Sequence, residues 1–383
     1  MKREEKRMLI EIHMLKNYPA TNLNRDDMGA PKNCIFGGIQ RGRISSQCLK
    51  RSWRMSPLFQ KDMAGHLGTR TRKMPQLVAE KLEEMGIAEE YFPAVQKKLT
   101  GFANKSGKET DTGYTSQIVI YSPEDILAIA EVIKAEVDAC ASVKEFEKKK
   151  ATDIEKMVKG ADTRPVSLDI ALFGRMVTST AFANVEASMQ VAHAFSTNKV
   201  LMETDFFTAM DDMIDGNDEL GSGMMGEVDY NSSCYYIYAS LDTEKLRDNL
   251  RHSEHPEEIV KAAVPSLLRT MAFTNPGGKQ NTFAGHALPS AVLVECKDDP
   301  IPVSYANAFV EPARAKGDKD LVMDSIGKLA EQVKTTTRDF PSLGARKRVW
   351  FCTGEKVKLE VDGSVSVPNF DALVQEVLAV SEK

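Results

Sequence analysis

The sequence predicts an α+β protein in which a ferredoxin-like sheet of β-α-β-β-α-β connectivity carries a large helical insertion and a protruding hairpin. Strand-like runs occur at the start of the chain and recur after residue 160, and the segment between them has the spacing of amphipathic helices. Residues 197–231 are irregular and rich in methionine, glycine and acids, which is typical of a protruding hairpin. We therefore expect residues 1–45 and 161–383 to form the sheet domain, and residues 46–160 to form the insertion.

The first strand and the first helix are expected near the N-terminus. Residues 8–15 alternate as a strand does, and the polar residues 16–44 are expected to form a long loop. Ser45 or Ser46 suits the N-cap of a helix that Pro57 stops. Further helices of the insertion are expected at 75–85, 89–99 and 124–138.

The second half of the chain supplies the remaining strands. Strands are expected at 165–174, 187–196, 234–241 and 291–296, and helices at 256–273, 321–333 and 370–380. The core therefore reads strand, helices, three strands, helix, strand, which resembles an RRM-like sheet. The basic tripeptide 346–348 is expected to be a solvated loop.

Positive charge is concentrated in one part of the chain. The net charge is −5, yet residues 28–79 contain ten Lys and Arg against Asp62 alone. This segment therefore carries +9 and leaves −14 for the rest. Because solvated surfaces normally mix both signs, the segregation indicates a phosphate-binding face on an acidic body.

Cysteine usage and hydropathy indicate the compartment. The six cysteines are scattered without a CxxC pair, as expected of reduced thiols in a cytoplasmic protein. No stretch approaches the roughly 20 apolar residues of a membrane span. We expect a cytoplasmic protein without membrane association.

The helix expected after Ser45 presents a row of cations. Lys50, Arg51 and Arg54 share one of its faces, behind an N-terminus whose free amides also favour anions. Arg41 and Arg43 approach from the preceding loop. Such contacts grip the phosphate backbone and read no bases, so sequence-tolerant binding is expected.

A second loop, residues 275–283, carries Lys279 and Gln280 after a helix. It suits an anion nest with one charge. A plain helix stop and turn explains the same residues equally well.

Five blocks of sequence stand in a characteristic order. They are N-R-D-D-M with I-F-G-G and R-I-S-S-Q-x-L-K-R (24–51), D-I-A-L-F-G-R-M (169–176), Q-V-A-H-A (190–194), D-F-F-T-A-M-D-D (205–212) and G-K-Q-x-T (278–282). In this order they resemble the CasC family, the guide-RNA-binding backbone subunit of the type I-E CRISPR complex Cascade. The last 45 or so residues resemble the family only loosely.

The resemblance implies a hand-shaped, non-catalytic subunit with an RRM-like palm, helical fingers and a thumb hairpin. Several copies would stack head to tail on the guide RNA (crRNA) beside other Cascade subunits. Each thumb would displace one nucleotide at regular spacing and leave short segments free to pair with target DNA. The complex would serve antiviral DNA interference.

The resemblance also implies roles for individual residues. Lys50, Arg51 and Arg54 would grip phosphates, with Ser45 and Gln47 assisting. Met176 and Thr208 match the residues that sandwich the RNA at the displaced nucleotide, although Met176 taken alone reads as core. Further RNA contacts would come from Arg25, Lys32, Arg41, Arg43, Lys279 and Gln280.

Two other functions compete with this interpretation. Asp26 and Asp27 are adjacent carboxylates near the basic segment, where a metal-dependent ribonuclease would place them. Ion pairs with Arg25 or a neighbouring subunit explain them better, because no third carboxylate is tied to them. A stand-alone RRM-like RNA binder would need stacking aromatics, and no such motif occurs. No phosphate-binding loop or nucleophile elbow is present, and we expect no metal and no cofactor.

Overall fold

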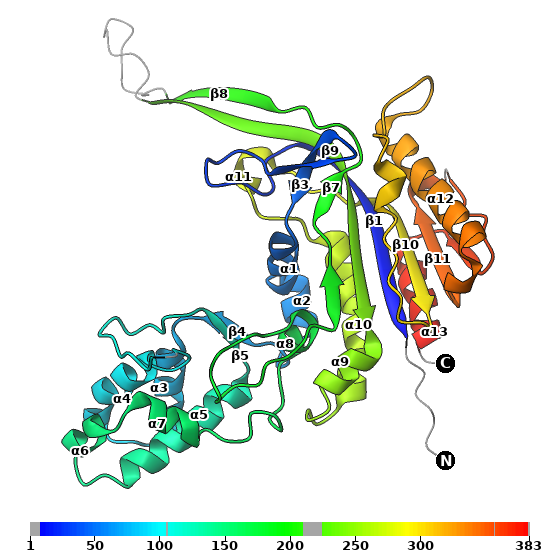
Figure 1. Cartoon of the computed structure of the whole chain (residues 1–383). Coiled ribbons are helices and arrows are strands. Elements are labelled where there is room, and N and C mark those ends of the chain that lie inside the picture. Colours follow the sequence, from blue (N-terminus) through cyan, green and yellow to red (C-terminus); the bar gives the residue numbers. More distant parts are fainter. Residues whose placement is uncertain (1–7, 105, 210–223, 356, 382–383) are drawn as a thin grey trace, which may run out of the picture. The chain divides into compact units, whose positions relative to one another are not determined.

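The computed structural model describes residues 8–104, 106–209, 224–355 and 357–381. The chain divides into two compact units, which are described separately (Figure 1). The sheet unit comprises Met1–Phe59, Gln190–Asp242 and Val264–Lys383, and the helical unit comprises Gln60–Met189 and Thr243–Ala263. The fold is α+β with one large mixed sheet, as the sequence predicts.

The sheet is organised around β1 (Leu9–Thr21), which lies antiparallel to both β9 (Met224–Asp242) and β10 (Pro289–Lys297). The strand order is β12-β11-β10-β1-β9-β7-β3-β2. Of the pairings along this order, β11 with β12 is parallel and the others are antiparallel. The outer strands are β2 (Asn33–Phe36), β3 (Ile39–Ile44), β7 (Ala194–Ser196), β11 (Lys347–Cys352) and β12 (Ser364–Val367).

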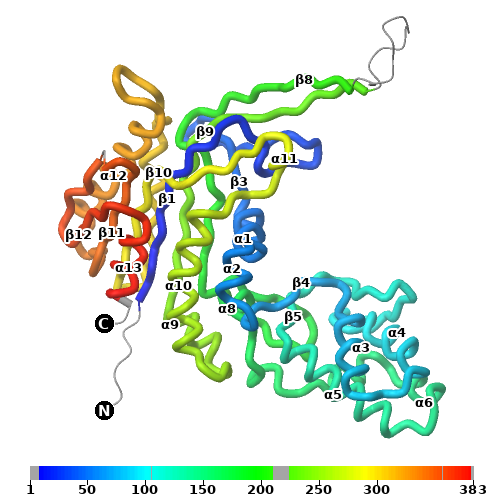
Figure 2. The backbone as a smooth tube through the Cα atoms, turned by 180° about the vertical axis from the view of Figure 1, so that it is seen from behind, coloured from blue at the N-terminus to red at the C-terminus, as the bar shows by residue number. Residues whose placement is uncertain are grey.

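Helices cover both faces of the sheet, which explains why the first eight residues of β1 are all buried. α12 (Leu321–Asp339) packs against β1 and β9, and α13 (Phe370–Ser381) packs against β10 and β11. The opposite views of Figures 1 and 2 show α12 and α13 on different sides of the sheet. Leu15 and Leu293 join the hydrophobic cluster that includes Leu329 of α12.

Charged groups are buried in pairs on the α12 face of the sheet. Arg348 donates to Glu295 at 2.6 Å, and Glu11 is paired with Lys297. Burial alone would raise the pKa of Glu295, but His13, Lys297 and Arg348 outweigh it and hold that pKa at about 2. The prediction of a solvated loop at residues 346–348 is therefore wrong for Arg348, which is buried in β11.

Most predicted elements are confirmed, but residues 16–44 are not a loop. β1 continues to Thr21, and β2 and β3 form a hairpin. Gly37 and Gly38 connect them with φ of 59° and 74°, values that glycine adopts at little cost in two-residue turns. The two-glycine signal was present in the sequence, but it lay within a polar segment.

One further prediction is wrong. Residues 165–174 are not a strand, because Leu168–Phe173 form the short helix α8 and Gly174 ends it with φ 82°. A short apolar run does not distinguish a buried helix from a strand. As predicted, α1 (Ser46–Arg54) ends before Pro57, which also begins α2 (Pro57–Asp62), where its missing N–H costs nothing.

The helical unit packs α3 (Met74–Glu84) and α5 (Pro123–Asp138) around its own core. Val78, Leu99 and Ile133 are fully buried there. Besides α8 and a 3-10 turn at Glu89–Tyr91, this unit contains β4 (Thr69–Thr71), α4 (Phe92–Thr100), β5 (Val119–Tyr121), α6 (Val143–Lys148), α7 (Ala151–Met157) and α9 (Thr243–Asn249). The chain also forms β6 (Met189–Val191), α10 (Pro256–Phe273) and α11 (Gln280–Phe283).

β8 (Glu203–Ala209) pairs with the first part of β9, and this two-stranded ribbon extends beyond the rest of the sheet (Figure 1). Every residue of β8 is exposed. The ribbon lies in the range where the sequence predicts a protruding hairpin. The tip of that hairpin, residues 210–223, lies outside the described residues.

Candidate nucleic-acid interface

Helix α1 separates an apolar face from a basic one. Ser45 is its N-cap, and the Ser45 hydroxyl accepts a hydrogen bond from the Cys48 amide at 3.3 Å. Leu49 and Trp53 are buried and fix the orientation of the helix. The opposite face carries Gln47, Lys50, Arg51 and Arg54, as the helical period requires.

The loop that precedes β2 is tied to the start of α1. Asn24 Oδ1 accepts a hydrogen bond from the Ser45 amide at 2.9 Å. Arg43 donates through Nε to the Asn33 carbonyl at 3.1 Å, and its Nη1 lies 3.0 Å from His193 Nδ1. The side chains of β3 and of the β6–β7 connection therefore meet beside the helix.

The cations around α1 act on the pKa values of two neighbouring groups. Burial lowers the pKa of His193, and Arg43 and Lys32 lower it further. Burial raises the pKa of the Cys48 thiol, whereas Lys32 and Arg51 act to lower it. Lys32 is bonded to its neighbours directly, since its carbonyl accepts from the Arg43 amide at 2.8 Å and its amide donates to the Asn24 carbonyl at 2.8 Å. We call Lys32, Arg43, Gln47, Lys50, Arg51 and Arg54 the basic surface.

Arg41 is placed differently from its neighbours. It is fully buried, and its guanidinium donates to the carbonyls of Ser196, Thr197, Phe309 and Val310 at 2.6–3.3 Å. These bonds join β3 to the segment that precedes α12. Arg41 therefore holds the sheet unit together and is not part of the basic surface.

The second predicted loop packs against the first. A Cβ atom on Gly278 would lie 2.3 Å from the Leu23 carbonyl oxygen, so only glycine allows this approach. The two loops line a shallow pocket of about 440 Å³ that Arg25, Asp26 and Asp27 also line.

Neighbours hold the side chains of these loops in different ways. Lys279 adopts φ 49° at the start of α11, and Gln280 donates to the Pro276 carbonyl at 2.8 Å. Asp26 Oδ1 accepts from the amides of Met28 and Ala30, both at 3.0 Å. Asp26 therefore stabilises its own turn.

Met176 and Thr208 lie in different units and are both exposed. Met176 belongs to the helical unit and its side chain is 93% exposed, which contradicts the expectation of core that its residue type alone gives. Thr208 lies on the β8–β9 ribbon, directly across from the exposed Met225.

The structure adds residues that the sequence did not single out. Met28 and Ile35 are 88% and 78% exposed, on the loop and strand next to the basic surface. His193 is exposed and pairs with Arg43, although its apolar surroundings in the sequence predict a core residue. Exposed apolar side chains beside cations are suited to contact the faces of unstacked bases.

In the described part of the chain, no three His, Cys, Asp or Glu side chains are grouped as a metal ion requires. Among the helices that the structure describes, none has the length and apolar character needed to cross a bilayer.

Comparison with solved structures identifies the class of protein. A chain of a "CRISPR RNA-guided surveillance complex, pre-nicking" superposes with a TM-score of 0.81 and 28% identity, covering 97% of this chain and all of the other. A second chain, from a "CRISPR RNA-guided surveillance complex", gives a TM-score of 0.60 and 22% identity, covering 97% and 99%, and supports the fold alone. The fold is therefore that of subunits of CRISPR surveillance complexes.

The family follows from the sequence itself. The model of the family described as CT1975-like protein, a Cas family, matches residues 10–376. The chain belongs to this family, and its resemblance to the Cascade backbone subunits is confirmed. No curated protein matches the chain.

Proposed function

We propose that this protein is a non-catalytic backbone subunit of a Cascade complex of type I-E, which binds crRNA and oligomerises along it. The observation that carries the proposal is the basic surface of α1. It places Lys50 and the two arginines of the last helical turn, Arg51 and Arg54, opposite a face that Leu49 and Trp53 bury. This arrangement binds phosphates without reading bases, as a subunit that must accept any guide requires.

The architecture supports the assignment of a palm, fingers and thumb. The antiparallel order β10-β1-β9-β7 equals the 4-1-3-2 order of a ferredoxin-like sheet when the strands are numbered along the chain, which supports an RRM-like palm. The helical unit corresponds to the fingers, and the β8–β9 ribbon to the thumb. The exposed Met176 and Thr208 would then contact the RNA at a displaced nucleotide.

The partners follow from this role. The RNA bases remain free to pair with target DNA, because the proposed contacts are made to phosphates. Other copies of the chain and other Cascade subunits complete the assembly. The competing ribonuclease is not favoured, because the Asp26 carboxylate is engaged by two amides of its own turn.

Binding to unrelated RNAs tests the proposal. We expect single-stranded RNAs of guide length but different sequence to bind with affinities within about threefold, all weakened by salt. An affinity that depends strongly on sequence, or that is insensitive to salt, would contradict a backbone clamp. As a control, duplex DNA of equal length tests whether charge alone accounts for the affinity.

A further inference from the structure

Met176 is an exposed apolar side chain on a segment that is otherwise firmly held. Its neighbours Arg175 and Val177 are buried. Arg175 and Val185 exchange two backbone hydrogen bonds of 2.9 Å, and the Val177 amide donates to Asn184 Oδ1 at 2.6 Å. The backbone on both sides of Met176 is therefore fixed while its side chain projects into solvent.

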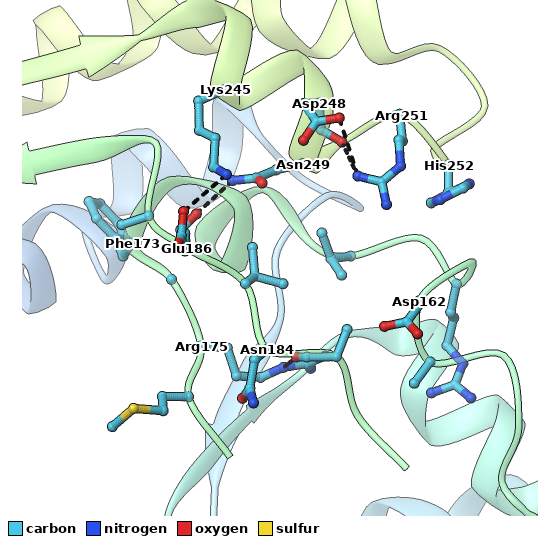
Figure 3. Close-up of a pocket in the computed structure, with 18 residues that line it drawn as sticks. Asp162, Phe173, Arg175, Asn184, Glu186, Lys245, Asp248, Asn249, Arg251 and His252 are labelled. Atoms are coloured by element: carbon cyan, nitrogen blue, oxygen red, sulfur yellow. Dashed lines mark hydrogen bonds and ion pairs between the residues drawn. The ribbon is translucent and has the colours of Figure 1, made fainter. Parts of the chain in front are cut away.

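Met176 is exposed to solvent although a cavity lies next to it. A cavity of about 860 Å³ has Met176 in its lining, together with Arg175, Asn184 and Asn249 (Figure 3). Burial of an apolar side chain lowers the free energy, so Met176 would be expected to turn into the cavity unless its backbone prevents this. Something must hold the segment in its extended position.

One buried carboxylate, that of Asp125, is bonded to two arginines that hold the Met176 segment. Asp125 lies in the first turn of α5 and is 2% exposed. Its Oδ2 pairs with Arg175 Nη1 at 2.5 Å and accepts from the Ser122 amide at 3.0 Å, and its Oδ1 pairs with Arg164 Nη1 at 2.9 Å. A single side chain thus joins α5 to two arginines, in a buried setting where such pairs are geometrically demanding.

The two arginines extend this hold to both sides of the Met176 segment. Arg175 Nε donates to the Ala183 carbonyl at 3.0 Å, and its Nη1 donates to the Ile120 carbonyl at 3.2 Å. Arg164 Nη1 donates to the Ala181 carbonyl at 3.1 Å. The segment that carries Met176 and the segment that returns from it are therefore both bonded to arginines that pair with Asp125.

We propose that Asp125 is a positioning residue that, through Arg175 and Arg164, holds Met176 extended against the RNA. The inference rests on the proposed function, in which Met176 contacts the guide at a displaced nucleotide. Asp125 itself touches no RNA. Its effect is to keep the Met176 side chain in a fixed position against the RNA, so that nucleotides are displaced at regular intervals.

The test compares D125N with D138N, a matched change on the exposed end of the same helix, where Asp138 pairs with Lys134 at 2.7 Å. Hydrogen exchange on the protein without RNA is measured first. We expect D125N, but not D138N, to speed exchange of the Val177 and Val185 amides at least tenfold. Unchanged exchange in folded D125N would overturn the proposal, whatever RNA does.

Nuclease footprints of the RNA complex are measured second. We expect D125N to weaken the periodic protection as much as M176A does, the double variant to be no worse than M176A, and affinity to change less than threefold. Additive effects of D125N and M176A would overturn the positioning role. If the unaltered complex shows no periodic protection of the RNA, the proposed function is refuted. Hydrogen exchange would still decide whether Asp125 holds the segment that carries Met176. Should D125N fail to fold, R175K is measured in the same two assays with the same expectations.

Discussion

Removal of charge from α1 gives the strongest test of the basic surface. The variant K50Q/R51Q/R54Q keeps long side chains, which preserves packing along their stems, and glutamine is compatible with a helix. Leu49 and Trp53, which anchor the helix, are untouched. We expect the variant to fold and to lose RNA affinity.

The size of the loss follows from counterion release. Each phosphate contact on a single strand contributes about 0.7 to the slope of log affinity against log salt, so three contacts contribute roughly 2. If the three contacts contribute nothing at about 1 M salt, this slope makes them worth roughly a 50-fold gain in affinity at about 0.15 M, which the variant should lose. The loss should shrink as salt rises, because the interaction removed is electrostatic.

The assay is equilibrium binding of a guide-length RNA over a series of salt concentrations. The control variant K81Q/K134Q/R338Q removes equal charge from α3, α5 and α12, at side chains that are 40%, 36% and 73% exposed. We expect its salt slope to stay within about 0.5 of the unaltered protein. If both variants lose affinity equally, net charge and not the α1 surface controls binding, and the reasoning is refuted.

Three further outcomes are expected. Burial lowers the pKa of Lys16 to about 7, so the folded protein loses this proton before the unfolded chain does. Unfolding free energy should therefore rise by about 2 kcal/mol between pH 7 and 9 in the unaltered protein but not in K16M, as urea unfolding at both pH values would show. G278A should destabilise the protein by about 1–3 kcal/mol and weaken RNA binding, because the added Cβ would meet the Leu23 carbonyl. The Cβ added in the control G277A has no atom within 4 Å, so that variant should be neutral in the same assays. D26N/D27N should leave RNA cleavage at background with and without divalent metal; loss of a metal-dependent activity would restore the ribonuclease hypothesis.

Local signals in the sequence predicted the elements of the basic surface well. The Ser45 cap, the apolar pair Leu49 and Trp53 and the row of cations are all within one helix, so the helical period alone fixes their faces. The α+β class and most helices were also predictable, because strand and helix periodicities are visible within short stretches of sequence.

Properties that depend on distant contacts were not predictable. Arg41 and Arg43 are two residues apart in one strand, yet Arg41 points into the sheet unit and Arg43 points to solvent beside His193. Side chains two apart in a strand leave from the same face, so Arg41 is buried because its guanidinium reaches the carbonyls of Thr197 and Phe309, which are far away in the sequence. Met176 is exposed next to Arg175, whose buried ion pair with Asp125 joins residues 50 positions apart, and no local pattern reveals that contact.

Native mass spectrometry of the protein, purified from its host with the RNA it carries, tests the central claim most directly. The proposed backbone role predicts several copies of this chain on one guide-length RNA, with other subunits attached and a constant number of nucleotides per copy. A single copy on RNA, or protein free of RNA, would contradict it.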